Sequence, residues 1–147
     1  MMRESLIEFF ERDLQRLEEE ISLYEREEDI WKVRKEIMNS AGTLCLHLLG
    51  NLNHFIGAVL GGTAYIRNRD QEFASVQIPR AMFLNELEKT REVVRKTLGT
   101  LSSSDFEETY PLEKHGRIVS TGHMLLHLLS HLNYHLGQIN YHRRLIS

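Results

Sequence analysis

The segment from Ser120 to Arg144 constrains the fold more than any other part of the chain. No proline interrupts it, and apolar residues recur every three or four positions: Leu125, Leu128, Leu132, Leu136 and Ile139. This spacing is the period of an α-helix, and Ser120 or Thr121 is a good N-cap. The segment is therefore predicted to form one long helix whose apolar face must be buried against other elements.

A row of histidines borders that apolar face. His127, His131 and His135 follow one another four residues apart, and each such step turns about 40° around a helix. Neighbouring imidazoles can therefore point at the same spot, and neutral imidazole nitrogens are good ligands for Zn²⁺, Ni²⁺ or Fe²⁺. The row predicts a divalent-metal site. The alternative is a set of packed, hydrogen-bonded core histidines with no metal.

Three other segments have the same apolar period, and the four together predict an all-α four-helix bundle. The earlier helices are expected at about Ser5–Tyr24, at Ala41–Leu60, and from the first turn at Pro79 to the stop at Ser102. Residues 109–119 are expected to form a short hairpin before the last helix, with His115 in a solvated turn.

The second helix carries a border histidine of its own. His47 lies at the edge of the apolar stripe, and Asn51 and His54 fall within about 40° of it on a helical wheel. Gly50 and Gly57 cost helix propensity but permit close approach by a neighbouring helix. A ligand from this helix and two from adjacent turns of the last one would leave metal positions open for water or substrate.

The loop at residues 63–78 is long for a compact domain, so we expect it to be functional or to conceal a short helix. Within it, Arg67, Arg69 and Asp70 are interpreted as a local ion-pair cluster, with binding of an acidic ligand as the alternative. Trp31 is the only tryptophan of the chain and is expected to seal one end of the bundle. Cys45 is the only cysteine and is expected to be a small core residue.

Composition excludes several classes of protein. The 147 residues suit a single domain spanning 1–147, and 18 basic residues are interspersed with 21 acidic ones, which argues against a nucleic-acid partner. No apolar run is long enough for a membrane span, and the first residues do not resemble a signal peptide. One cysteine fits a reducing compartment, so a cytoplasmic location is expected. Neither the His-Glu-x-x-His nor the Glu-x-x-His signature occurs.

Two stretches, HLLGNLNHFIG from His47 and LLSHLNYHLGQINYHRRL from Leu128, resemble the DinB/YfiT-like superfamily of metal-binding four-helix bundles. The likeness covers nearly the whole chain, including RNRDQEF in the long loop. The ending His-x-x-x-His-x-Gly-Gln is its most specific part. The resemblance implies that His47, His131 and His135 bind a divalent metal (zinc, nickel or iron), with His54 and His127 as competitors. Asn51 and Gln138 are candidates for the outer hydrogen-bond partners of those ligands.

The same resemblance implies a function. Characterised relatives include transferases and isomerases that use low-molecular-weight thiols, and many pair as homodimers. We therefore expect a metal-dependent thiol S-transferase or a related hydrolase that acts on an electrophilic substrate. Two alternatives stay open: a metal-binding stress protein without turnover, and a plain structural bundle. A homodimer face is expected to include Phe10, Tyr134 and Tyr141.

Overall fold

The computed structural model describes residues 2–74 and 76–146. The chain is all-α, and no β-strand occurs among the described residues. The long helices are α1 (Met2–Leu23), α2 (Ala41–Leu52), α4 (Arg80–Gly99) and α5 (Thr121–Ile146). The short helical segments are η1 (Glu27–Trp31), η2 (Asn53–Ala58), α3 (Arg69–Glu72) and η3 (Ser104–Phe106).

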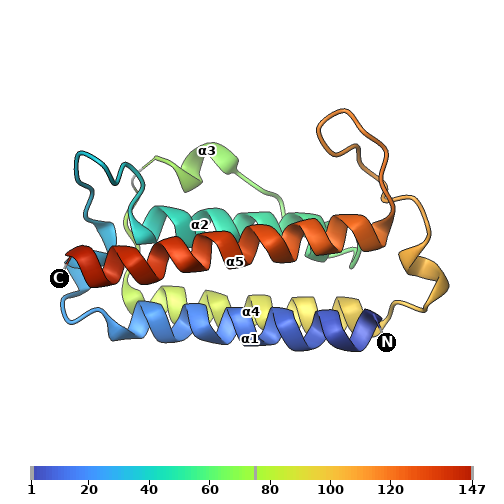
Figure 1. The fold of residues 1–147 in the computed structure, drawn as a ribbon, viewed down its shortest axis with the longest axis horizontal. Helices are drawn as coiled ribbons and strands as arrows, with labels where there is room; N and C mark the ends of the chain where they lie inside the picture. The colour runs from blue at the N-terminus through green and yellow to red at the C-terminus, as the bar shows by residue number, and fades with distance from the viewer. Residues whose placement is uncertain (1, 75, 147) are drawn as a thin grey trace.

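The long helices lie side by side in two layers (Figure 1). One layer contains α1 and α4, and the other contains α2 and α5, which run antiparallel to each other. The short helix α3 lies outside this pair, against α2. This arrangement places residues near the middle of α2 opposite residues near the middle of α5, and it brings the loop that contains α3 over the same region.

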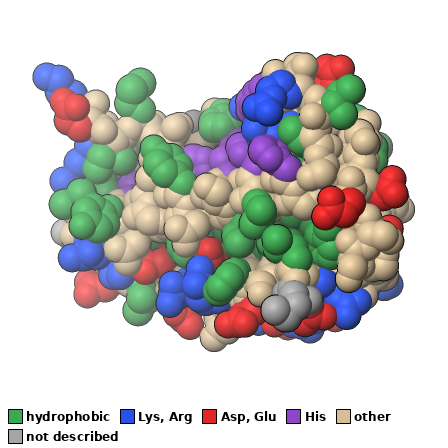
Figure 2. Space-filling view, turned by 45° about the vertical axis from the view of Figure 1, so that its right-hand side comes forward, with side chains coloured by type: hydrophobic (Ala, Val, Ile, Leu, Met, Phe, Trp, Pro, Cys, Tyr) green, Lys and Arg blue, Asp and Glu red, His purple; other side chains and the backbone are tan. Residues whose placement is uncertain are grey.

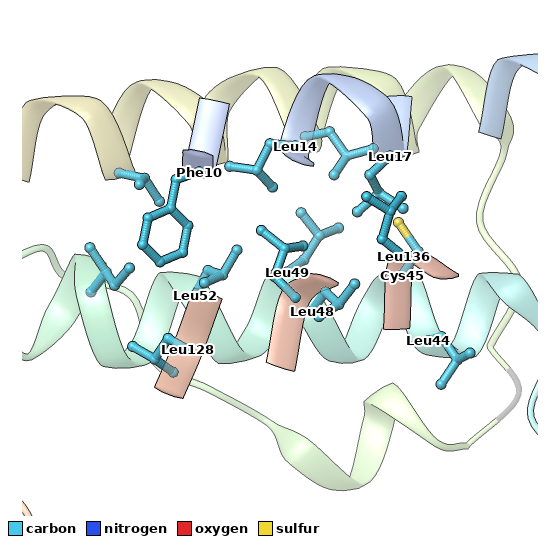
Figure 3. Packing of buried hydrophobic residues seen from close by; sticks show 14 of the residues in the cluster. Phe10, Leu14, Leu17, Leu44, Cys45, Leu48, Leu49, Leu52, Leu128 and Leu136 are labelled. Carbon is cyan, nitrogen blue, oxygen red and sulfur yellow. The ribbon is translucent and has the colours of Figure 1, made fainter. Parts of the chain in front are cut away.

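A continuous apolar core fills the space between the layers (Figure 3). The fully buried stripe of α1 includes Phe10, Leu14 and Leu17, which face Leu48 and Leu52 of α2. Cys45 is buried in this core, as expected, and burial raises the pKa of its thiol. The two layers are therefore held together mainly by the burial of apolar side chains, at roughly 25 cal/mol for each Å² removed from water.

The helix ends agree with the capping residues in the sequence. The side chain of Ser40 accepts a hydrogen bond from the Thr43 amide at the start of α2, and Ser120 accepts one from the His123 amide at the start of α5. Pro79 is the N-cap of α4 and lies one position outside the first turn in which it was expected. The long loop does conceal a short helix, α3, whose last residue, Glu72, is buried.

The second helix differs from the expected α-helix in its last part. From Asn53 to Ala58 it is a π-helix, with the Val59 amide donating to the His54 carbonyl, five residues back. The Asn53 side chain donates to the Leu49 carbonyl, and the Tyr110 hydroxyl donates to the Phe55 carbonyl at 2.7 Å. These bonds satisfy backbone groups where the helix register changes, and such π segments are frequent at functional sites.

The hairpin expected before α5 forms only as a loop with isolated bridges. Thr109 pairs with Ser120, and Lys114 with Arg117, without a strand. His115 lies exposed in the turn at φ 50°, followed by Gly116 at φ 75°. The turn was placed correctly. Too few backbone hydrogen bonds connect its arms for a ladder to develop.

The burial of Phe10 and Asp13 and the packing of Trp31 show how individual side chains fit into the fold. Phe10 is completely buried, so it cannot belong to a dimer face. Asp13, on the first helix, is completely buried, and Arg12 and Asn133 both donate to its carboxylate. Trp31 stacks on Phe83 and rests on Gly42 at one end of the helices, as expected. Among the described residues, every helix is too short or too polar to cross a membrane.

Candidate metal centre

Three histidines from two helices converge on one point. The Nε2 atom of His131 lies 3.1 Å from Nε2 of His47 and 3.1 Å from Nε2 of His135. One ring nitrogen from each of the three residues lies within 4.8 Å of the other two. His47 comes from α2, and the other two come from adjacent turns of α5. The structure thus brings together the three residues that the sequence singled out.

The spacing of these nitrogens fits a common metal ligand set. Bonds of about 2.0–2.1 Å from zinc to imidazole, at angles of about 90–109°, separate two ligand nitrogens by about 2.9–3.4 Å. The two distances of 3.1 Å fall in this range. Three protein ligands would also leave coordination positions free, as in reactive rather than purely structural zinc sites. The residues therefore fit a divalent metal ion.

A buried carboxylate fixes the proton of His47. Nδ1 of His47 lies 3.1 Å from Oε1 of Glu72, and Arg67 donates to the same carboxylate from Nε at 2.8 Å and from Nη2 at 2.9 Å. Arg67 Nη2 also lies 3.4 Å from Nδ1. The carboxylate can only accept a hydrogen bond, so we assign the Nδ1 proton of His47 to the shorter contact, the one with Glu72. Nε2 of His47 then carries a lone pair directed at the centre.

Gly50 makes room for this carboxylate. A Cβ atom at position 50 would lie 1.9 Å from Oε2 of Glu72 and 3.2 Å from Nε of Arg67. The absence of a side chain on this turn of α2 allows α3 to approach closely enough for Glu72 to reach His47. The close approach expected at Gly50 is thus made by the loop helix.

Gln138 has the same role for His135. Its Oε1 atom lies 2.7 Å from Nδ1 of His135, and its Nε2 donates to the Tyr134 hydroxyl at 3.3 Å. Because the amide oxygen can only accept, Nδ1 of His135 is the donor. Nε2 of His135 therefore also presents a lone pair to the centre. The outer partner expected at Gln138 is found in the structure.

His131 occupies the middle of the cluster, where its surroundings disfavour protonation. Burial, followed by the neighbouring His135 and His47, lowers its pKa to about 4. Burial also lowers the pKa of His47. Nδ1 of His131 is buried and has no hydrogen-bond partner among the described residues. At neutral pH His47 and His131 are therefore neutral imidazoles, the form that binds metals.

The competing histidines lie outside the cluster. The His54 ring packs against Phe55 on η2, and the centroid of the His127 ring lies 6.5 Å from that of His131, in a stacked arrangement. Among the described residues, Asn51 forms no hydrogen bond to the three ligand candidates, and its buried Oδ1 has no hydrogen-bond partner. The outer role expected of Asn51 is instead filled by Glu72.

The sequence interpretation did not identify Glu72 and paired Arg67 with the wrong residue. Arg67 forms its ion pair with Glu72 and not with Asp70, which is exposed. Glu72 lies 25 positions from His47, so no local spacing connects them. The available signals were the length of the loop and the inclusion of RNRDQEF in the family likeness.

Figure 2 shows histidine side chains forming a band across one face of the molecule.

These observations define a class: an all-α protein with a three-histidine candidate metal centre between two antiparallel helices. A family model described as "Protein of unknown function (DUF1572)" matches residues 3–147, and the chain belongs to this family. The family is DinB-like. No curated protein sequence is significantly similar to the chain.

Proposed function

We propose that this protein is a DinB/YfiT-like four-helix bundle that binds one divalent metal ion, zinc, nickel or iron, through Nε2 of His47, His131 and His135. One observation supports this most strongly. Glu72 and Gln138 fix the protons of His47 and His135 on their outer nitrogens, so two lone pairs point at His131 Nε2. A single proton on His131 can satisfy only one of them well, whereas a cation at the centre would satisfy all three nitrogens.

We further propose that the metal-loaded protein transfers a group from an electrophile to a low-molecular-weight thiol. A bound divalent ion holds a thiol as the thiolate at neutral pH. The chain supplies three neutral nitrogen ligands on rigid helices, and two outer partners hold their orientation. In the reaction the thiol proton goes to solvent, a carbon–sulfur bond forms, and the leaving group departs with its electron pair.

The experiment for this reaction uses 1-chloro-2,4-dinitrobenzene with cysteine as the thiol. Formation of the thioether releases chloride and is followed by absorbance. We expect zinc-loaded protein to accelerate the reaction at least tenfold over free zinc, and His135→Ala to lose that acceleration. Loaded protein with no acceleration for this or other small thiols would favour the alternative of a metal-binding protein without turnover.

A homodimer and a cytoplasmic location complete the proposal, both based on the family likeness and on the composition. Tyr134 and Tyr141, two of the residues expected at a dimer face, are exposed, and the homodimer is proposed without assigning its face to them. Light scattering during size-exclusion chromatography measures the mass directly. A mass of one chain, 17.3 kDa, across the micromolar range would contradict the homodimer.

A further inference from the structure

A pocket of about 500 Å³ adjoins the histidine cluster on the side of the C-terminal half of α5. His135 and Gln138 form part of its wall, and Leu44 of α2 and the loop around Met38 form other parts. Its volume is in the range of small-molecule sites, about 300–1,000 Å³. A pocket at the N-terminal end of α5 shares no residue with the cluster. A third pocket, over α2 and α3, is lined by Glu72 but by none of the three histidines.

Exposed apolar side chains form much of the wall of this pocket. Met38 is 83% exposed, Tyr134 64%, Tyr141 62% and Leu145 59%. Single exposed apolar side chains are ordinary, but four around one concave site indicate a surface that binds something. The guanidinium of Arg144 lies 5.1 Å from the Tyr141 ring centroid, where it covers one face of that ring.

The polar groups on the α5 wall of the pocket are largely committed to the protein. Both ring nitrogens of His142 are used, one with the Tyr24 hydroxyl and the other with the Lys32 carbonyl. Gln138 is used by His135 and Tyr134. The other polar side chains of the lining, Glu36 and Asn39, are exposed on the loop. The part of the wall beside the cluster therefore offers few donors or acceptors, whereas an apolar body would remove the exposed apolar side chains from water.

We propose that this pocket is the binding site for the apolar, aromatic body of a substrate whose donor atom reaches the metal at His135. The ligand class is a thiol, or a similar one-donor molecule, with an aryl group of about one ring attached through a short linker. This inference rests on the proposed function for the donor atom, but the apolar site itself consists of the side chains around Met38 and Tyr141. It assigns the 36–39 loop and the C-terminal half of α5 to substrate selection.

The test follows methionine methyl groups by NMR in protein labelled with [methyl-¹³C]methionine. Met38 lines the pocket, and Met82, 47% exposed on α4, is the internal control. Phenylmethanethiol and ethanethiol are titrated into zinc-loaded and zinc-free protein. We expect phenylmethanethiol to shift the Met38 signal with at least tenfold higher affinity than ethanethiol, while the Met82 signal stays in place.

Two variants on α5 sharpen the test. Tyr141→Ala should weaken binding of phenylmethanethiol at least fivefold without changing the zinc content or the affinity for ethanethiol. Leu126→Ala removes a similarly exposed side chain at the other end of α5, beside a different pocket, and should change neither affinity. Equal affinities for the two thiols, or equal shifts at Met38 and Met82, would overturn the inference.

The outcomes separate the two proposals. Protein that takes up no zinc, but whose Met38 signal still shifts with phenylmethanethiol, refutes the proposed function and supports the pocket. Protein that binds zinc stoichiometrically, but shows no preference for the aryl thiol, refutes the pocket alone. A Met38 signal that shifts on simple dilution without ligand would show that a second copy of the chain covers this face, and it would also overturn the inference.

Discussion

Nδ1 of His47 lies 3.1 Å from Oε1 of Glu72, and both residues are buried between α2 and α3. This contact connects the long loop to the histidine cluster. It makes the loop part of the candidate site, because the carboxylate determines which nitrogen of His47 faces the other two histidines.

Replacing Glu72 by Gln should weaken metal binding through His47. The amide offers a neutral acceptor and leaves the largely buried Arg67 without its ion-pair partner. Loss of such an outer partner typically costs 10–100-fold in metal affinity, and we expect a loss of that size in competition titrations with a chromophoric chelator. Asp70→Asn, which removes an exposed carboxylate from the same short helix, is the matched control. Equal affinities in the two variants would show that Glu72 has no role in holding His47.

Replacing Gly50 by Ala should disturb the same contact from the other side. The new Cβ would overlap the Glu72 carboxylate, at 1.9 Å from Oε2, and must displace it from His47. We expect weaker metal binding, similar to that of Glu72→Gln, and a lower melting temperature.

Gly137→Ala is the control for this change. Gly137 also lies within a long helix, but a Cβ there meets no heavy atom within 4 Å. Its replacement should raise stability by up to about 1 kcal/mol through helix propensity and leave the metal affinity unchanged. If Gly50→Ala behaved like Gly137→Ala, the tight packing of Glu72 on α2 would be wrong.

The stability of the metal-free protein should fall with acid partly through His142. Burial lowers the pKa of this histidine in the folded state, and the nearby Arg34 lowers it further, against the opposing effects of the Lys32 carbonyl and Asp29. The unfolded chain therefore binds the proton first. The contribution of His142 is fully present above pH about 6.5, and it is lost as the pH falls from there to the lower folded pKa.

Urea unfolding of wild-type protein and His142→Gln between pH 7.5 and 5 measures this contribution. His47 and His131, whose pKa values are also lowered by burial, contribute to both proteins in the same window, so the difference between them isolates His142. The wild type should lose more stability than the variant. A variant with the same or a steeper loss would contradict the buried, neutral state of His142.

The long helices and the histidines were predictable because their signals are local. The period of apolar residues placed α1, α2, α4 and α5, and Ser120 marked the start of the last helix. Four-residue spacing put His131 and His135 on one face. A border position on the second helix indicated His47, and the family likeness selected these three from the five candidates.

What the sequence could not supply depends on contacts between distant residues. The buried carboxylate of Asp13 accepts hydrogen bonds from its neighbour Arg12 and from Asn133, which lies on α5. Glu72 belongs to the site because Gly50 leaves space for it. The π segment at Asn53–Ala58 is stabilised in part by the Tyr110 hydroxyl, which comes from a distant loop. None of these has a signature in the spacing of neighbouring residues.

The most direct test of the account is elemental analysis of protein purified without a metal-affinity tag, beside His131→Ala and the turn variant His115→Ala. His131 is at the centre of the cluster, and His115 is an exposed turn residue outside it. The account predicts about one divalent metal ion per chain in wild type and His115→Ala, and none in His131→Ala. No metal in wild-type protein even after incubation with zinc, nickel or iron(II), with unchanged melting in chelator, would contradict it and leave a structural helical protein with packed histidines.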